Sequence, residues 1–176
     1  PRMTTTGKAA RRRIDVAEAA ALIHARMPRW GTVTVPLDAA RGEVLRQVVT
    51  AERDQPAFDR VTMDGIALRH AAFAAGRRTF RVVGTQGAGS PPLPLVADGN
   101  GVAIMTGAAL PPGADTVVPV ERVARDGDEV TVEAGYAPVP GQFVHRRASD
   151  HRQGDVLLEP GSTLGPPEMA VLTVGG

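Results

Sequence analysis

An aspartate interrupts an apolar, strand-like run at residues 61–69, which read VTMDGIALR. Asp-Gly favours a turn, and a covered carboxylate needs hydrogen-bond donors around it. Asp64 is therefore either an acid that an exposed turn presents to a ligand, or part of an Asx turn with no further role. The local sequence leaves both interpretations open.

A second stretch, AIMTGAALPPGADTVVPVE, carries a strand into a turn at residues 106–108. Gly107 would allow backbone N–H groups to face a ligand, and the hydroxyl of Thr106 could add a contact. The same turn could equally be a hairpin end that the Pro-Pro-Gly at 111–113 closes. Glu121 ends the strand that follows, where an exposed edge charge is the ordinary explanation.

A third stretch, HRRASDHRQGD at residues 145–155, groups arginines around Asp150. Guanidinium groups bind phosphates and other oxyanions in a planar two-point geometry, while an aspartate can orient an arginine or hold a metal. We therefore take Arg146 and Arg147 as candidate anion-binding residues. A solvated loop with exposed charges is the alternative.

Several other kinds of site are excluded. The chain has no cysteine, which rules out disulfides, thiolate metal sites and cysteine nucleophiles. Its four histidines show no HExxH and no close pair at helical ligand spacing, so we predict no metal ligands in this chain. The Gly-rich GTQGAG at 84–89 lacks the flanking strand and helix of a nucleotide fold and predicts a turn.

The elements that must position these residues are mainly short strands. From residue 51 onward, brief β-branched runs alternate with Gly, Pro and Asp. Aromatic residues make up only 3% of the chain against 43% apolar residues, so the core must be aliphatic. HAAFAAGRR at 70–78 predicts a short helix, and SPPLPLVADGNG at 90–101 predicts a surface loop.

Partly helical segments flank this β-rich part. Asp15 and Glu18 have the spacing of a capping box, and apolar residues recur at helical spacing until Pro28, which predicts a helix over about 15–26. A short strand and a helical turn that Asp38 could cap are expected within 32–45. The prolines at 166–167 suit the first turn of a helix near the C-terminal end.

We therefore expect an α+β, β-rich fold in which a β-rich domain is inserted into a discontinuous, partly helical domain. Residues 52–148 form the inserted domain, and residues 14–51 plus 149–176 form the linker and dimerisation domain around it. Residues 1–13 carry five basic residues and no acid, and we expect a disordered, solvated tail.

Composition also limits the partners. A basic arm could touch nucleic acid, but the chain has few aromatics and no interleaved basic stripe, so we expect no nucleic-acid partner. No run approaches the ~20 apolar residues of a membrane span, and no apolar signal-peptide core follows the basic N-terminal end. We expect a cytoplasmic protein with no membrane contact.

Taken together, the motifs resemble a known family. The chain resembles the N-terminal half of MoeA-type molybdopterin molybdenumtransferases, which are related to the gephyrin E domain. The resemblance rests on three stretches in this order: FDRVTMDGIALR, GVAIMTGAALPPGADTVVPVE, and the Arg-rich stretch that runs on to the C-terminal end. The resemblance covers the chain from about residue 14. It departs at Ile66, where the family has tyrosine, and at 148–150, where the family's Gly-Glu-Asp reads Ala-Ser-Asp.

This resemblance implies an enzyme that inserts molybdenum from molybdate into adenylylated molybdopterin and releases AMP. Family members continue into an α/β domain that holds the main binding site, including Mg²⁺, and we expect that domain to be absent from this chain. The resemblance also implies a homodimer in which this region lends residues to the rim of the partner subunit's cleft. A non-catalytic dimerisation or scaffold module of the same architecture is the alternative.

The resemblance further implies which residues line the cleft. Three would act as catalytic residues, namely Asp64, Thr106 and Asp150. Four would contact the substrate, namely Gly107, Glu121, Arg146 and Arg147.

Overall fold

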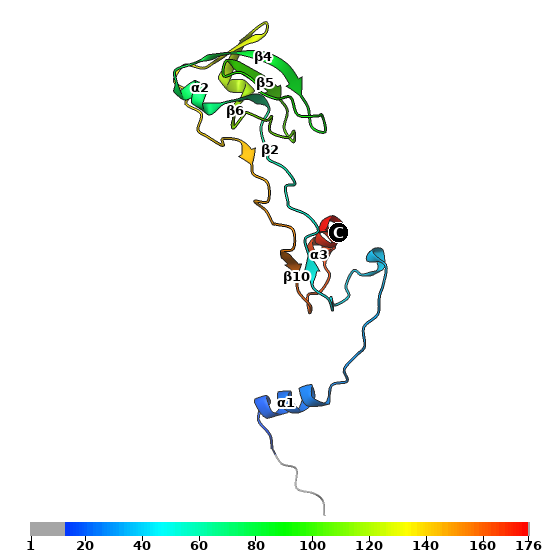
Figure 1. Cartoon of the computed structure of the whole chain (residues 1–176). Helices are drawn as coiled ribbons and strands as arrows, with labels where there is room; N and C mark the ends of the chain where they lie inside the picture. The colour runs from blue at the N-terminus through cyan, green and yellow to red at the C-terminus, as the bar shows by residue number, and fades with distance from the viewer. Residues whose placement is uncertain (1–12, 176) are drawn as a thin grey trace, which may run out of the picture. The chain divides into compact units, whose positions relative to one another are not determined.

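The computed structural model describes residues 13–175, and the chain divides between Val35 and Pro36 into two units (Figure 1). The basic tail predicted at 1–13 lies outside the described residues apart from Arg13. The boundary falls within the segment 14–51 that we assigned to one domain. The discontinuous domain therefore stays a prediction.

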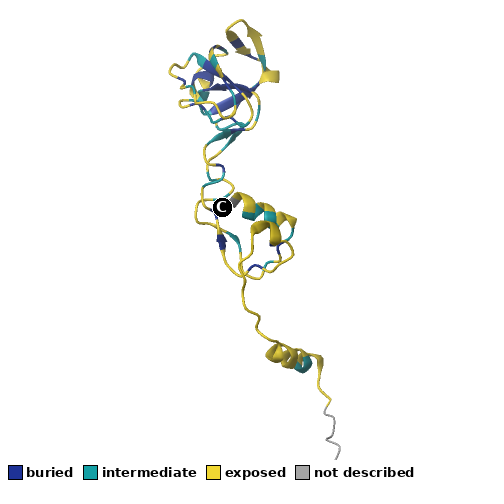
Figure 2. Cartoon of the chain, turned by 90° about the vertical axis from the view of Figure 1, so that its right-hand side faces the viewer, coloured by how far each residue is buried: buried dark blue, intermediate teal, exposed yellow. Residues whose placement is uncertain are grey.

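Helix α1, Val16–Arg26, belongs to the first unit and confirms the predicted helix. Its N-cap is Asp15, whose Oδ1 accepts a hydrogen bond of 2.7 Å from the backbone N–H of Glu18. This bond satisfies one of the N–H groups that a helix leaves unpaired at its start. No residue of α1 is buried (Figure 2), so the apolar side chains of this helix are open to solvent.

The strand predicted within 32–35 does not form, because residues 31–36 have no strand partner in the described structure. The short 3₁₀ helix η1, Leu37–Ala39, follows with Pro36 at its N-cap position. Asp38 therefore lies inside the turn and does not cap it, contrary to our expectation.

The helix near the C-terminal end packs on a small two-stranded ladder. Strand β1, Val49–Thr50, pairs antiparallel with β10, Val156–Leu158. Helix α3, Pro166–Gly175, follows β10 and starts with the two prolines, as predicted. Segments far apart in the sequence thus share one apolar cluster, which consists of Ala40, Leu45, Val49 and Leu164 with Leu157, Leu158, Met169 and Leu172 against them.

The β-rich part is built on one six-stranded sheet with the order β6-β3-β5-β4-β8-β7. Its strands are β3 (Gly65–Leu68), β4 (Thr79–Gln86), β5 (Asn100–Ile104), β6 (Thr116–Pro119), β7 (Val123–Asp126) and β8 (Glu129–Val132). All neighbours are antiparallel except β4 and β5. The short helix α2, His70–Ala74, and the 3₁₀ turn η2, Val120–Arg122, connect strands. The fold is α+β and rich in strands, as predicted.

Both faces of the sheet are covered by apolar side chains. Ile66 and Leu68 of β3 pack in one cluster with Phe73 and Phe80, while Ala67 of the same strand belongs to a second cluster. Successive side chains of a strand point to opposite faces, so a strand in two clusters is buried on both sides. All four residues of β3 are accordingly buried.

Two chain segments connect this sheet with the β1–β10 ladder, and we call residues 51–61 and 144–155 the neck. Strand β2, Arg60–Val61, pairs antiparallel with β9, Val144–His145. An isolated bridge between Gln55 and His151 continues the pairing toward the ladder. Backbone hydrogen bonds therefore run along the neck between segments that are distant in sequence.

Gly65 allows the closest backbone approach in the sheet. It lies opposite Ile104 of β5 and Pro119 of β6. A Cβ atom at this position would lie 2.1 Å from the carbonyl oxygen of Val118, well inside the contact distance. The glycine after Asp64 is therefore required by strand packing.

We predict that Gly65→Ala destabilises the chain by about 3 kcal/mol, because β6 must move away to accept the methyl group. Thermal unfolding followed by circular dichroism measures this loss. Gly87→Ala is the matched control, since the nearest atom to its added methyl group would be the Ser90 hydroxyl at 3.8 Å. Equal stability of the two variants would contradict the close approach.

Candidate functional site

Asp64 and Thr106 are in direct contact at one end of the sheet. Oδ1 of Asp64 accepts hydrogen bonds from the backbone N–H of Thr106 at 2.6 Å and from its hydroxyl at 2.7 Å. Both residues are exposed. The contact follows from topology: β5 runs antiparallel to β3, so the turn after β5 meets the residue that precedes β3.

These two donors hold Asp64 in its ionised form. The backbone N–H of Thr106, and then its hydroxyl, lower the pKa of the Asp64 carboxyl below its usual 3.8, against a smaller opposing effect of desolvation. Hydrogen bonds to a charged group favour that charged state. The site thus presents a negative charge whose direction the turn at Thr106 sets.

Gly107 does not present a free N–H group. Its backbone N–H donates to the carbonyl oxygen of Val61 at 2.9 Å, and its φ of 87° lies in the left-handed region that favours glycine. The expectation that this N–H faces a ligand is therefore wrong for this conformation, because the neck strand β2 uses it. Gly107 shapes the turn that carries Thr106.

Glu121 lies in η2, directly after Val120, which contacts Asp64. The backbone N–H of Val120 donates to the carbonyl oxygen of Asp64 at 3.0 Å. Glu121 is exposed, as a charge at the edge of a sheet would be. The hydrogen bond and charge of Glu133 raise the pKa of Arg122, and the charge of Glu121 adds a smaller effect in the same direction. Tertiary structure thus brings Asp64, Thr106 and the start of η2 to one edge.

Asp150 belongs to a different cluster, in the neck. Its Oδ1 lies 2.8 Å from Nε2 of His145, and Nδ1 of the same ring lies 3.1 Å from a guanidinium nitrogen of Arg60. Within the described residues, no hydrogen bond or ion pair joins Asp150 to Asp64 or Thr106. Of the three predicted catalytic residues, Asp64 and Thr106 therefore form a pair, and Asp150 belongs to a separate cluster.

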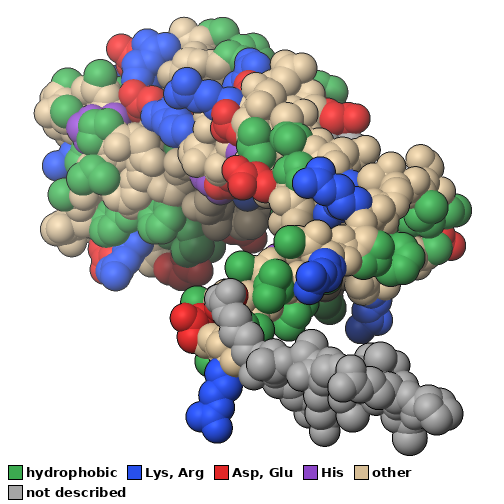
Figure 3. Space-filling view, turned by 90° about the horizontal axis from the view of Figure 1, so that it is seen from below, with side chains coloured by type: hydrophobic (Ala, Val, Ile, Leu, Met, Phe, Trp, Pro, Cys, Tyr) green, Lys and Arg blue, Asp and Glu red, His purple; other side chains and the backbone are tan. Residues whose placement is uncertain are grey.

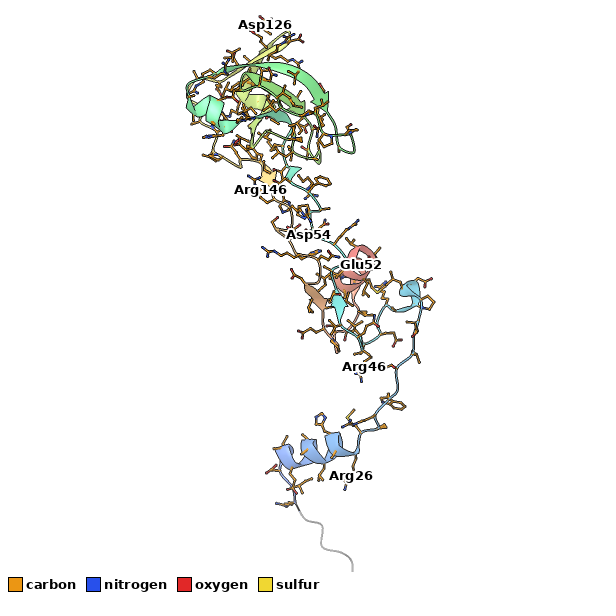
Figure 4. The ribbon with its side chains drawn as sticks, viewed as in Figure 1. Arg26, Arg46, Glu52, Asp54, Asp126 and Arg146 are labelled. Carbon is orange, nitrogen blue, oxygen red and sulfur yellow. The ribbon has the colours of Figure 1, made fainter. Side chains whose placement is uncertain are left out.

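Arg146 and Arg147 each have an acidic partner that sequence analysis missed. Arg146 lies 2.7 Å from Asp59, and Arg147 lies 2.7 Å from Asp54. Figure 4 labels one member of each pair, Arg146 and Asp54. Asp59 also accepts from the backbone N–H of Arg147, and Asp54 from the backbone N–H of Gln153. The arginines are thus held by carboxylates, and their charge is compensated within the neck.

The acidic partners are ionised for different reasons. Burial raises the pKa of Asp59, but hydrogen bonds from the Arg147 N–H and the Arg146 side chain outweigh this effect and lower it. The backbone N–H of Gln153, followed by the Arg147 side chain, lowers the pKa of Asp54. Asp54 and Asp59 in RDQPAFDRV (53–61) are opposite in charge to Arg146 and Arg147 in VHRR, and this is the signal that could have revealed these pairs.

Two sequence departures have clear structural positions. Ile66 is 4% exposed and packs in the sheet's core, so its side chain is not part of the exposed pair formed by its neighbour Asp64. Ala148 has a φ of 59°, the left-handed conformation in which an L-residue with a side chain is strained. A glycine at position 148 would adopt this conformation without that strain.

Other candidate sites are not supported in the described part of the chain. No group of three or more His, Asp or Glu side chains converges there to hold a metal ion. Two shallow hollows, one around Arg77, Arg78 and Asp98 and one around Arg81 and Arg125, include none of the predicted site residues. None of the helices within residues 13–175 has the length and apolar character that crossing a bilayer requires.

The chain is similar to known proteins over nearly its whole length. Residues 14–176 match the family described as "MoeA N-terminal region (domain I and II)". A molybdopterin molybdenumtransferase of Synechocystis sp. is 40% identical over 163 residues, which are 93% of this chain and 42% of that protein. One from Staphylococcus aureus strain Mu50 is 32% identical over 167 residues, again 93% of this chain and 39% of that protein.

Solved structures agree with this likeness. The crystal structure of a molybdopterin biosynthesis moeA protein from Pyrococcus horikoshii OT3 superposes with a TM-score of 0.74 at 34% identity. The match covers 81% of this chain and 38% of that one. This chain therefore spans about two fifths of the length of the relatives it matches.

We predict that Asp64 titrates below 3.8 and that Thr106→Val raises its pKa part of the way back, because the variant keeps the N–H donor and loses the hydroxyl. Carboxyl-carbon NMR measures both values. Since the folded-state pKa is the lower one, the contact stabilises the fold above pH 3.8 and is lost as the pH falls through the lowered value. Thr131→Val, which loses a hydroxyl contact to Thr79, is the control and should leave Asp64 unchanged.

Proposed function

The chain belongs to the family of MoeA N-terminal regions, and from this premise we propose that it is the N-terminal part of an enzyme that inserts molybdenum from molybdate into adenylylated molybdopterin. The relatives that share 93% of this chain are named molybdopterin molybdenumtransferases. Because the chain spans 42% of the Synechocystis relative, the activity is proposed for a protein that also has the remaining part.

The observation that carries this proposal is the Asp64–Thr106 contact. Two family motifs that lie some forty residues apart in the chain meet there, and both residues remain exposed. Exposed turns are poor places to gain stability and good places to present polar atoms from a rigid scaffold. The buried sheet behind the pair provides that scaffold.

The charge of Asp64 restricts what it can bind. An ionised carboxylate repels molybdate and phosphate, so Asp64 is suited to accept hydrogen bonds from N–H or O–H groups of the pterin-type substrate. Both of its contacts to Thr106 use Oδ1, so Oδ2 is the atom that we assign to such donors. The Thr106 hydroxyl, which donates to Asp64, retains lone pairs as an acceptor.

Asp150 and the two arginines contribute from the neck. The side chains of Arg146 and Arg147 remain about half and two thirds exposed, at 53% and 65%, although each is paired with a carboxylate. We assign them a supporting role toward anionic groups of the substrate, with Asp150 and Glu121 at the rim. Gly107 acts through the shape of the turn.

For Mg²⁺ we propose the α/β domain that the resemblance implies for the remaining part of the protein. The Mg²⁺ would help to hold the phosphate-bearing substrate, and Asp64 and Thr106 would help to orient it. The cytoplasmic location stays a prediction.

We also propose a homodimer. Several apolar side chains of the first unit are more than half exposed, namely Val16, Ile23, Met27, Trp30 and Val33 at 86%, 62%, 56%, 79% and 83%. Hydrophobic side chains are also exposed among charged ones on the face in Figure 3. These five exposed side chains within residues 16–33 offer apolar surface that an interface would bury, and a second copy of the chain is the occupant we propose.

One observation favours the alternative, a non-catalytic dimerisation or scaffold module. Both donors of Thr106 are used by Asp64, and the N–H of Gly107 is used by Val61. A turn whose donors are satisfied internally could serve only to close the sheet. The two functions are separated by experiment.

For this experiment, residues 14–176 replace the matching segment of the Synechocystis relative. We predict that Asp64→Asn or Thr106→Ala in this chimera lowers the rate of molybdenum insertion about a hundredfold, the usual loss when one preorganised contact to the transition state is removed. The unfolding free energy should change little by comparison, as for other surface substitutions. The chain by itself should not insert molybdenum.

Matched controls are Asp98→Asn, which loses an exposed ion pair to Arg69, and Thr131→Ala, which loses its contact to Thr79. Both controls should keep the full rate. A folded but inactive chimera would count against the proposed function. Full rates in both site variants would favour the scaffold module.

For the dimer, we expect light scattering of the chain at micromolar concentration to give twice the monomer mass. Ile23→Gln should weaken the dimer about 10- to 100-fold, which corresponds to the burial of one isoleucine side chain. Arg26→Gln on the same helix is the control, with little effect. A monomer under these conditions would argue against the interface.

A further inference from the structure

Gln86 is a polar side chain with no exposure to solvent. It is the last residue of β4 and has a relative exposure of 0%. Long polar residues are seldom fully buried, and an amide without partners is costly in an apolar environment. Sequence analysis treated the surrounding GTQGAG only as a turn, so the burial of Gln86 is information that the fold adds.

The amide of Gln86 joins two loops. Its Nε2 donates to the carbonyl oxygen of Ala109 at 2.6 Å, and its Oε1 accepts from the backbone N–H of Leu93 at 2.8 Å. The backbone carbonyl of Gln86 also accepts from the N–H of Met105 at 3.1 Å. Gln86 therefore binds the turn at residues 105–109 at its first and last residues.

The second loop lies against the tip of that turn. A Cβ atom built on Gly107 would lie 3.5 Å from the Cβ of Ala88, which is ordinary van der Waals contact. The N–H of Leu93 ties the far end of this loop to Gln86. One buried side chain thus determines how residues 87–93 and residues 105–109 lie relative to each other.

We propose that Gln86 is a positioning residue for the Asp64–Thr106 pair, holding the turn at 105–109 so that Thr106 directs both of its donors at the carboxylate. The functional part of this inference rests on the proposed function, whereas the geometric part concerns this chain alone. The side-chain hydrogen bonds of Gln86 go to Ala109 and Leu93, not to Asp64 or Thr106, so it acts through Ala109 and, by its backbone carbonyl, through Met105.

Packing alone does not account for a glutamine here. An apolar side chain of similar length would fill the volume without a buried amide that must be satisfied at both ends. What the amide adds is direction, since a donor and an acceptor at fixed positions select one arrangement of the two loops. Displacing the turn would draw the N–H and the hydroxyl of Thr106 away from Asp64.

The test uses the pKa of Asp64 in this chain as its readout, which needs no molybdenum chemistry. Gln86→Met keeps the length and removes both side-chain hydrogen bonds. We expect the pKa of Asp64 to rise toward 3.8 and the exchange of the Thr106 amide hydrogen to accelerate at least about tenfold.

Thr116→Val is the matched control. Thr116 is also 0% exposed, and its hydroxyl donates to the carbonyl of Val139, away from the turn. This variant should be destabilised as well, but the pKa of Asp64 and the exchange of the Thr106 amide should stay as in the unsubstituted chain. An equal shift in both variants would show a general loosening and would overturn the proposal.

Gln86→Glu tests for rescue. When the introduced carboxyl is protonated it again offers a donor and an acceptor, so Asp64, which titrates in acid, should keep its lowered pKa. Once the introduced carboxyl ionises at higher pH, it has no donor for Ala109. The protection factor of the Thr106 amide, which corrects for the intrinsic pH dependence of exchange, should then fall, and it should recover on acidification. This pH-dependent reversal tests the proposal even where Gln86→Met does not fold.

An unchanged pKa of Asp64 in folded Gln86→Met, or no reversal in Gln86→Glu, would overturn the positioning role. Failure of the proposed function looks different. In that case Asp64→Asn leaves molybdenum insertion unchanged in the chimera, while the pKa shift in Gln86→Met still occurs. If both proposals hold, Gln86→Met in the chimera lowers the insertion rate while Thr116→Val, with its own loss of stability, does not.

Discussion

The pairing of β3 with two antiparallel neighbours is the constraint on which the candidate site depends. β5 and β6 are both antiparallel to β3. The residues that follow these two strands therefore lie next to Asp64, the residue that precedes β3. Asp64 consequently meets Thr106 on one side and Val120 on the other. Gly65 makes this possible, since its lack of a side chain admits the carbonyl of Val118 at a distance that any other residue would block.

The polar groups around this edge are satisfied almost entirely within the chain. Thr106 donates to Asp64, Gly107 to Val61, and the buried amide of Gln86 to Ala109. A network of satisfied hydrogen bonds has a lower free-energy cost than the same polar groups left without partners, and it holds each group in one orientation. A ligand that approaches this edge would therefore meet side chains with directions already set, and the carboxylate of Asp64 would be the charge it encounters.

The neck follows the same principle with full charges. Asp54 and Asp59 hold Arg147 and Arg146, and His145 lies between Arg60 and Asp150. Ion pairs at exposed positions contribute little stability individually, but several linked pairs define the path of a narrow connection. The arginines that sequence analysis assigned to anion binding thus also hold together two segments that are far apart in the chain.

Local signals in the sequence determined much of this protein. The Asp15 cap placed α1, the double proline placed the start of α3, and the spacing of three motifs indicated the family and the α+β class. Tertiary structure alone decided that Asp64 contacts Thr106 and that Asp150 lies apart from them. It also decided that Asp54 and Asp59 pair with the neck arginines and that the amide of Gln86 is buried. The physical reason is the sequence distance over which each constraint acts. Helix caps and prolines constrain only a few neighbouring residues. Strand register and the burial of an amide depend on which distant segments pair, and no local pattern specifies that pairing.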